Sequence, residues 1–464
     1  MKSFFTDLAD FGKKVALIEN DTELTYLEMQ NEIDVIKEKF SGRGLAFCVC
    51  TNSIASVEGY VSFLQSNIPV VLINYHTDRE QFEEMVRLYS PSYLWVPEGY
   101  LSEDISFSHR NYTLVKHQGM IYPMHEELAV MLTTSGSTGS PKLVRQSYKN
   151  INANTASIVE YLNITGEDRA ITTLPMHYTF GLSVIQTHLM QGATIVLTEA
   201  TIVQPEFWKL IDKHQVTTFA GVPYTYEMLK KIRFLRMKVA SLRYLIQAGG
   251  KLGKELHYEM ATSCAEKGIK FIVMYGQTEA TARMSYVPAD HAIDKAGSIG
   301  IAIPGGKFWV EDTEGNKITE TGTAGELVYQ GENVTMGYAQ CKEDLERGYD
   351  QGNILHTGDM ACFDDDGYYY IVGRKKRFLK LFGNRVNMDE VEGLLKKIGL
   401  ECAVCGEDDH MKICVVGQDN KEIAEKYIDE HTSVPRFGYT VHVIEEIPRN
   451  DSGKVQYSEL ENMI

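Results

Sequence analysis

A loop rich in glycine and hydroxyl groups directly follows an apolar segment, Ala129–Leu132. It reads Thr-Thr-Ser-Gly-Ser-Thr-Gly-Ser-Pro-Lys from Thr133 to Lys142. Glycines let a backbone turn tightly and present N–H groups to an anion, while hydroxyls add donors and lysine adds positive charge. The spacing is not that of a Walker A loop, whose second glycine, after four intervening residues, is directly followed by lysine. The loop therefore predicts a phosphate site of another type, contacted by Thr134, Ser135, Gly136, Ser137, Thr138, Gly139 and Lys142.

Two further short motifs follow strand-like segments. The stretch Tyr275–Glu279 reads Tyr-Gly-Gln-Thr-Glu and comes after the apolar run Phe271–Met274. Its terminal carboxylate is the kind of ligand that Mg²⁺ prefers. The stretch Gln247–Gly250 reads Gln-Ala-Gly-Gly, and its lack of side chains would let a ligand approach the backbone closely. Taken singly, either stretch also fits a strand that ends in an ordinary turn.

Charged residues recur at three later places in the chain. His356–Asp359 reads His-Thr-Gly-Asp, and Arg374 follows Asp359 after fifteen residues. Close to the end, Pro448–Val455 reads Pro-Arg-Asn-Asp-Ser-Gly-Lys-Val. An isolated Thr-Gly-Asp turn or an exposed lysine occurs in many proteins. Only the order and spacing of the whole series indicate a functional site.

This series resembles the motif series of the acyl-adenylate-forming superfamily, from about Tyr26 to Lys454. That superfamily includes acyl-CoA synthetases, firefly luciferase and the adenylation domains of nonribosomal peptide synthetases. The resemblance implies an enzyme that uses ATP and Mg²⁺ to convert a carboxylic acid into an acyl-adenylate, with release of pyrophosphate. The acyl group then passes to a thiol, that of CoA or of a phosphopantetheine arm.

The same resemblance implies roles for single residues. Thr278 would touch the α-phosphate, and Glu279 would hold Mg²⁺ together with Thr138. Lys454 would bridge the attacking carboxylate and the α-phosphate as charge develops, which makes it the main catalytic residue. The rest of the nucleotide site would be formed by Gly249 and Gly250 beside adenine, by Tyr275 and Gly276 in the motif after the strand, and by Asp359 and Arg374 on the ribose.

The basic segment after Gly373 resembles the hinge of these enzymes. Lys376 falls where family members rotate a small domain between adenylation and acyl transfer, which lets one active site serve both steps. Lys380 and Gly383 match the stretch that faces the nucleotide only in the transfer state. A solvated basic linker would explain the charges but not the ordered pattern that ends at Glu392.

The acid pocket is expected around the stretch Leu174–Leu182, where His177 is the candidate gate or wall residue. Amino-acid-activating relatives carry Phe-Asp-x-Ser here, and their aspartate pairs with the substrate ammonium. This chain reads Phe-Gly-Leu-Ser from Phe180 to Ser183, and an unpaired ammonium would be costly once desolvated. We therefore expect an acid without an α-amino group, and the absence of long insertions favours a small, medium-chain or aromatic one.

Two alternatives to a CoA ligase remain at this level. A stand-alone adenylation enzyme that loads an acyl carrier protein would use the same thiol arm. A non-catalytic nucleotide-binding relative would be expected to have lost Lys454, Glu279 or Asp359, all of which are present.

The elements that must position these residues change in character along the chain. Strand-like runs alternate with helical spacing up to about Ala296, which predicts an α/β fold with stacked, mostly parallel sheets. Short strands then indicate a small β-barrel-like subdomain, and an α+β segment follows. We predict a large domain over residues 1–373 and a smaller, mobile C-terminal domain over residues 374–464.

Composition and charge argue against several other classes of protein. The 464 residues carry a formal charge of -17, which argues against non-specific binding to nucleic acid or anionic membranes. No signal peptide or membrane span is recognisable, so we expect a cytoplasmic protein. Cys402 and Cys405 are spaced like metal ligands, but their apolar neighbours favour a buried strand.

Overall fold

The computed structural model describes residues 3–101, 105–116, 121–133, 142–381, 384–432, 434–449, 453 and 455–464. The chain divides into two compact units. The first unit contains residues 1–307 and 330–355, and the second contains residues 308–329 and 356–464. The predicted boundary between residues 373 and 374 stays a prediction.

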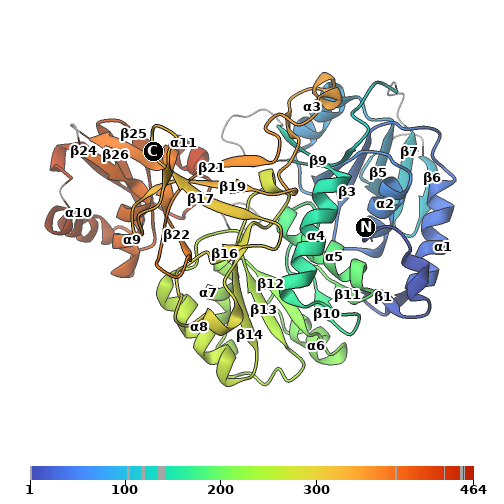
Figure 1. The fold of residues 1–464 in the computed structure, drawn as a ribbon, viewed down its shortest axis with the longest axis horizontal. Coiled ribbons are helices and arrows are strands. Elements are labelled where there is room, and N and C mark those ends of the chain that lie inside the picture. The colour runs from blue at the N-terminus through green and yellow to red at the C-terminus, as the bar shows by residue number, and fades with distance from the viewer. Residues whose placement is uncertain are drawn as a thin grey trace. The chain divides into compact units, whose positions relative to one another are not determined.

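Two large sheets form the first unit (Figure 1). The eight-stranded sheet has a parallel centre flanked by antiparallel strands. Its order is β20 (Gly337–Ala339), β9 (Leu143–Ser147), β8 (Leu128–Thr133), β4 (Val70–Asn74), β3 (Ala46–Cys50), β5 (Tyr93–Pro97), β7 (Tyr112–Lys116) and β6 (Ile105–His109).

The nine-stranded sheet is parallel over its six central strands, from β14 to β1. Parallel pairing requires crossovers, and helices supply most of them here. The order is β16 (Ile301–Ala302), β15 (Ser285–Tyr286), β14 (Lys270–Tyr275), β13 (Tyr244–Gln247), β12 (Thr218–Gly221), β10 (Arg169–Ile171), β11 (Thr194–Leu197), β1 (Val15–Glu19) and β2 (Thr22–Thr25).

Eight helices of the first unit cover these sheets, among the residues that the structure describes. They are α1 (Tyr26–Lys37), α2 (Ile54–Gln65), α3 (Arg79–Tyr89), α4 (Tyr148–Leu162), α5 (Thr179–Gln191), α6 (Pro205–Lys213), α7 (Pro223–Lys231) and α8 (Lys254–Glu266). Side-chain caps fix several starts, as where Thr25 and Glu28 form a reciprocal capping box on α1.

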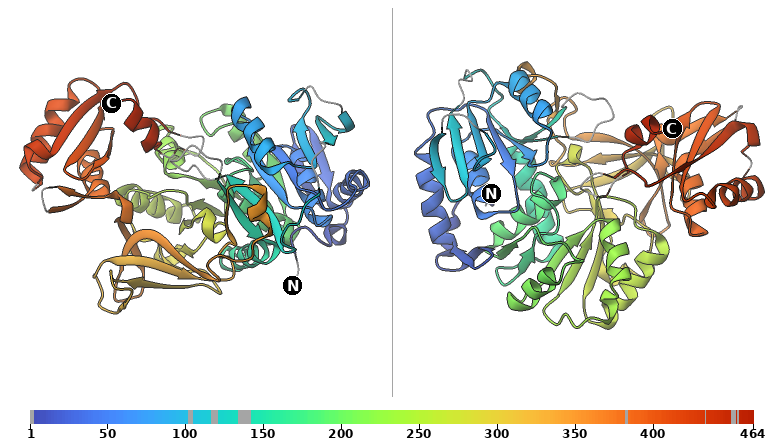
Figure 2. Two further views of the ribbon diagram at one scale, coloured as in Figure 1. Left: turned by 90° about the horizontal axis from the view of Figure 1, so that it is seen from above. Right: turned by 180° about the vertical axis from the view of Figure 1, so that it is seen from behind.

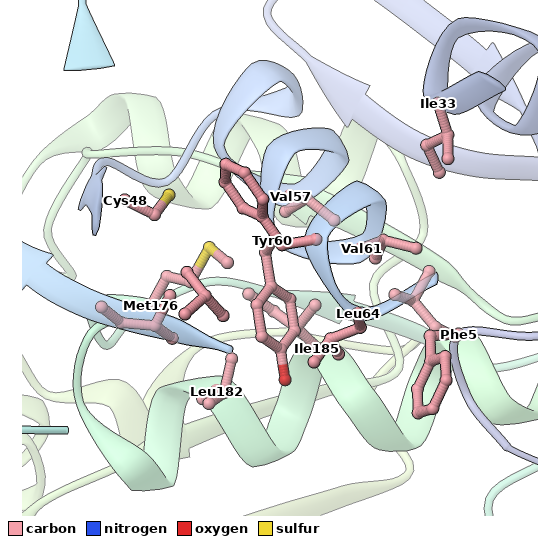
Figure 3. Close-up of a cluster of buried hydrophobic side chains, with 14 of the residues drawn as sticks. Phe5, Ile33, Cys48, Val57, Tyr60, Val61, Leu64, Met176, Leu182 and Ile185 are labelled. Atoms are coloured by element: carbon pink, nitrogen blue, oxygen red, sulfur yellow. The ribbon is translucent and has the colours of Figure 1, made fainter. Parts of the chain in front are cut away.

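Helices α2 and α5 pack against each other in the main core (Figure 3). Almost every residue of α2 is buried, so this helix lies within the core instead of on its surface. Tyr60 points from α2 towards α5, beside Leu182 and Ile185, and its hydroxyl accepts a hydrogen bond of 2.8 Å from Gln186. The core therefore holds the start of α5, which carries the predicted acid-pocket residues.

The second unit contains a five-stranded sheet, in which β17 pairs with β18 and β21 with β22 in antiparallel fashion, and a smaller α+β layer. The sheet has the order β18 (Lys317–Ile318), β17 (Lys307–Glu311), β19 (Gly325–Gln330), β21 (Ile354–Phe363) and β22 (Tyr369–Arg374). The α+β layer holds β23 (Phe378–Leu381), β24 (Asn384–Asn387), β25 (Cys402–Glu407), β26 (His410–Val416) and β27 (Tyr439–Ile444), with α9 (Met388–Lys397), α10 (Asn420–His431) and α11 (Tyr457–Asn462).

The two faces of the sheet formed by β25, β26 and β27 pack against different helices (Figure 2). Cys402 and Val404 share one apolar cluster with residues of α9 and α10. Ala403 and Cys405 belong to another cluster with Leu460 of α11. Alternate residues of a strand point to opposite faces, so both cysteines are buried strand residues, as the sequence indicated.

The predicted fold class is confirmed: large sheets with helices and a smaller α+β segment. Among the described residues, no helix combines the length and apolar character that crossing a membrane requires.

Candidate active site

The loops after the parallel strands meet at one edge of the nine-stranded sheet. Gly249, after β13, has a left-handed φ of 84°. A β-carbon there would lie 2.5 Å from the Tyr178 hydroxyl oxygen and 3.1 Å from a methyl carbon of Val222. Only glycine permits this approach, which brings the predicted adenine loop against the segments that follow β10 and β12. Ligands of α/β sheets bind at such a carboxyl edge.

The motif Tyr275–Glu279 leaves β14 at the same edge and turns back sharply. A β-carbon at Gly276 would collide with the backbone oxygen of Ala282. Thr281 has a φ of 66°, a strained value for a β-branched residue. Its hydroxyl donates to the Asn333 carbonyl at 2.7 Å, and its own carbonyl accepts from the Thr179 hydroxyl at the start of α5. The surrounding contacts thus hold the motif in a strained turn.

The carboxylate of Glu279 is oriented by a tyrosine that the sequence did not single out. The Tyr338 hydroxyl donates a hydrogen bond of 2.6 Å to Oε1 of Glu279. The Lys142 ammonium lies 3.3 Å from the centroid of the same ring, as a cation–π contact. Burial and the adjacent carboxylate raise the pKa of Tyr338, which keeps its hydroxyl protonated as a donor. Two predicted site residues therefore contact the side chain of Tyr338. Lys142 lies over its ring, and Glu279 accepts a hydrogen bond from its hydroxyl.

Strand β20 carries Tyr338 and is fixed by Arg145, which is fully buried in β9. The Arg145 guanidinium donates to the carbonyls of Met336 at 2.8 Å and Tyr338 at 3.2 Å, and it pairs with Asp350 at 3.1 Å. Strands β8 and β9 are antiparallel neighbours on either side of residues 134–141. The base of the predicted phosphate loop and the tyrosine beside Glu279 thus belong to one hydrogen-bonded sheet.

His177 lies half-buried in the turn that precedes α5. The neighbouring Tyr178 lies against Gly249, and burial raises the pKa of its hydroxyl to about 12. The Tyr178 side chain therefore stays neutral at physiological pH. The role of His177 as gate or wall stays a prediction.

The predicted ribose pair lies in the second unit. Asp359 of β21 and Arg374 of β22 are direct partners across an antiparallel ladder. The Nε atom of Arg374 lies 3.5 Å from Oδ1 of Asp359, whose side chain is 8% exposed, whereas the arginine side chain is 66% exposed. An aspartate held by an arginine of the neighbouring strand is suited to accept hydrogen bonds from vicinal hydroxyls.

The predicted hinge continues directly from β22 into a single 3₁₀ turn, Lys375–Arg377. Arg377 is buried, pairs with Asp389 at 2.5 Å and Glu392 at 2.7 Å, and donates to the Val404 carbonyl. It therefore anchors the end of the turn to α9 and β25. For Lys376 and Lys380, the structure describes only the course of the backbone.

Several predicted site residues lie outside the described residues: Thr134, Ser135, Gly136, Ser137, Thr138, Gly139, Gly383 and Lys454. Their roles stay predictions. Sequence reasoning also missed two described residues, Tyr338 and Arg283. A lone arginine in the otherwise uncharged run Ala280–Val287 was a signal that could have drawn attention to the second.

Comparison with known proteins gives a family match. The model of the family described as "AMP-binding enzyme" matches residues 4–339. A 2-succinylbenzoate–CoA ligase of Bacillus cytotoxicus is 27% identical over 73% of this chain and 70% of its own length. A medium-chain fatty-acid–CoA ligase of Escherichia coli is 29% identical over 71% of this chain and 60% of its own length. The solved o-succinylbenzoate CoA synthetase of Bacillus subtilis, in complex with an acyl-adenylate intermediate, has a TM-score of 0.80 at 21% identity and covers 99% of this chain and 98% of its own.

Proposed function

The chain belongs to the family of AMP-binding enzymes, and from this premise we propose that it activates a small carboxylic acid without an α-amino group and joins it to coenzyme A. The reaction class is that of an AMP-forming acid–thiol ligase. The carboxylate attacks the α-phosphorus of ATP, pyrophosphate leaves, and a thiol then displaces AMP from the acyl-adenylate. The relatives named as CoA ligases support this class and this acceptor.

The observation that carries the proposal is the group formed by Lys142, Tyr338 and Glu279. ATP-dependent activation needs charge neutralisation and positioning more than it needs a protein nucleophile. Lys142 supplies a cation at the base of the phosphate loop, and Glu279 supplies carboxylate oxygen for Mg²⁺. Tyr338 fixes the direction of that carboxylate, so the residues fit a metal–nucleotide complex.

The remaining roles are proposals on the same basis. Thr278 would contact the α-phosphate, and Asp359 with Arg374 would hold the ribose hydroxyls. We propose that Lys454 stabilises the negative charge that develops during attack, because charge placed in advance lowers the barrier without reorganisation.

The start of α5 supports the proposal of an acid without an α-amino group. The position that carries aspartate in amino-acid-activating enzymes is Gly181, and a β-carbon there would press on the backbone oxygen of Pro175. No carboxylate can therefore be introduced at this position without shifting the turn. A carrier protein remains the alternative acceptor, and a cytoplasmic location remains a prediction.

Pyrophosphate release tests the proposal, with ATP, Mg²⁺ and a panel of carboxylic acids, each with and without CoA. We expect acid-dependent release that CoA stimulates. Release that needs hydroxylamine in place of CoA would point to a carrier protein, and no release with any acid would contradict the proposed activity.

A Lys454→Ala variant tests the assigned catalytic residue in the same assay. We expect adenylation to fall by about 10²–10³-fold, the size of effect typical for a lost transition-state charge contact. Lys421→Ala, at an exposed position of α10, is the matched control and should keep the parent rate. Equal rates for the two variants would remove Lys454 from the mechanism.

A further inference from the structure

Arg283 is a buried arginine that has no acidic partner in the described part of the chain. It lies between the motif Tyr275–Glu279 and β15 and is 1% exposed. Among the residues that the structure describes, no carboxylate oxygen lies within ion-pair distance of its guanidinium, and its Nε–H is buried with no hydrogen-bond partner. Burying an unpaired charge ordinarily costs several kcal/mol, so the arrangement needs an explanation.

The neighbours of the guanidinium are neutral. One terminal nitrogen lies 3.0 Å from the Ser183 hydroxyl, and the other lies 3.4 Å from the Tyr161 hydroxyl and 3.3 Å from the Met274 sulfur. The group also stands 5.0 Å from the centroid of Phe180. Hydroxyls, a thioether and an aromatic face hold the guanidinium in place, but they do not neutralise its charge.

The other two buried arginines show how this chain compensates such charges. Arg145 has Asp350 and several backbone carbonyls as partners. Arg377 has Asp389 and Glu392. Arg283 alone of these three lacks an acidic partner among the described residues, which points to a partner from outside the chain.

The guanidinium lies where such a partner could arrive. Phe180 and Ser183 belong to the first turns of α5, directly after His177 and Tyr178. Met274 lies at the carboxyl end of β14, one residue before the motif that ends in Glu279. This is the sheet edge at which α/β proteins bind their ligands. The same edge carries the acid-activating residues of the proposed function.

We propose that Arg283 binds a second carboxylate of the acid, so that the preferred substrates are dicarboxylic acids. This inference rests on the proposed function for the first carboxylate, which is the one activated. The planar guanidinium matches a carboxylate in a two-pronged pair, and its free Nε–H completes one prong. The distal carboxylate thereby neutralises Arg283, while Phe180 and Tyr161 flank the pair and exclude water.

Binding tests the inference independently of catalysis. The probes are matched acid pairs that differ by one carboxyl group: glutarate with pentanoate, suberate with octanoate, and 2-succinylbenzoate with 4-oxo-4-phenylbutanoate. We expect at least one diacid to raise the melting temperature of the full chain more than its monoacid partner, and Arg283→Gln to lose that difference. Arg283→Lys should keep part of it, and Arg79→Gln, on an exposed face of α3, should keep it all.

Pyrophosphate release with the same pairs separates the two proposals. We expect kcat/KM for the favoured diacid to fall at least roughly 30-fold in Arg283→Gln, because an unpaired carboxylate would be buried, while the monoacid value stays or rises. Equal use of diacids and monoacids by the parent enzyme would overturn the inference and leave the proposed function intact. Diacid binding that depends on Arg283 without any pyrophosphate release would support the inference and contradict the function. The inference would be overturned if no diacid bound more tightly than its monoacid partner. It would also be overturned if each variant, Arg283→Gln and Arg283→Lys, lost as much kcat/KM with the monoacid as with the diacid.

Discussion

At the scale of single residues, Tyr338 determines how Glu279 is presented. A hydrogen bond to a charged group contributes about 1.5–3 kcal/mol, and the partners that orient metal ligands typically change affinity or activity by about 10–100-fold. We therefore expect Tyr338→Phe to lower adenylation by about 10-fold or more and to raise the Mg²⁺ concentration needed for half-maximal rate. Pyrophosphate release at varied Mg²⁺ measures both effects.

Tyr349→Phe is the matched control for that variant. Tyr349 is also half-buried, and its hydroxyl donates to Glu127 at 2.9 Å and approaches the Ser147 hydroxyl at 2.8 Å. The Tyr349→Phe variant therefore removes a tyrosine–glutamate hydrogen bond in the same unit and leaves the bond to Glu279 in place. An unchanged Mg²⁺ requirement in Tyr338→Phe, or the same change in both variants, would contradict the orienting role.

The residues of the site differ in how far the sequence could predict them. Lys142 and Glu279 belong to motifs whose residue types already suit phosphate and Mg²⁺. Tyr338 lies in a three-residue strand, too short for any periodicity, and matters only because β20 pairs with β9. Arg283 could be seen in the sequence, but its lack of an acidic partner within the described ranges is a property of packing. Contacts between distant segments therefore limit what motif reasoning can find.

At the scale of elements, local patterning predicted most of the helices and central strands. The apolar segments Ala129–Leu132 and Phe271–Met274, for example, lie within β8 (Leu128–Thr133) and β14 (Lys270–Tyr275). The sequence did not reveal the antiparallel edge formed by β6 and β7, nor the return of β20 to β9. Strand order depends on pairing partners far away in the chain, and hydrophobic spacing carries no record of it.

A cluster of charged side chains links α1, α2 and β6. Glu58 of α2 has a fully buried side chain, and its Oε2 lies 2.9 Å from His109 Nε2 and 3.2 Å from Arg110 Nε. Glu32 of α1 contacts the same histidine and arginine. Burial is the main cause that raises the pKa of Glu58 from 4.5 to about 7, and the neighbouring Glu32 adds to it against the opposing effect of His109 and Arg110.

This shift makes stability depend on pH with a definite sign. The folded chain keeps the Glu58 proton up to about pH 7, whereas the unfolded chain loses it near pH 4.5. The protonated Glu58 therefore contributes its full stabilisation of the folded chain below pH 4.5, and this contribution is lost as the pH rises to about 7. We expect the free energy of unfolding of Glu58→Gln, relative to the parent, to rise between pH 5 and pH 8 by up to about 3 kcal/mol. Urea unfolding at both pH values measures it, and an equal difference at the two would contradict the expectation.

At the scale of the whole molecule, the division into two units matters for the order of the half-reactions. The predicted phosphate and metal residues belong to the first unit, whereas Asp359, Arg374 and Lys454 belong to the second. A ligase that uses one site for two steps must exchange the groups presented to the substrate between them. We predict that the small domain rotates about the backbone at Lys376, which lies between β22 and the anchor residue Arg377.

Lys376→Pro tests the turn. Proline is tolerated in the first turn of a helix, so the 3₁₀ turn Lys375–Arg377 should form, but φ at position 376 becomes fixed. If the backbone rotates here after adenylation, as we predict, acyl transfer should slow by about 10-fold or more while pyrophosphate release in the first turnover changes little. Rapid-mixing measurements of pyrophosphate and thioester separate the two steps.

Lys376→Ala removes the side chain without fixing the backbone and should keep both rates in their parental ratio. Equal slowing of both steps in the proline variant would place the turn elsewhere, because a defect of folding or nucleotide binding affects the two steps alike.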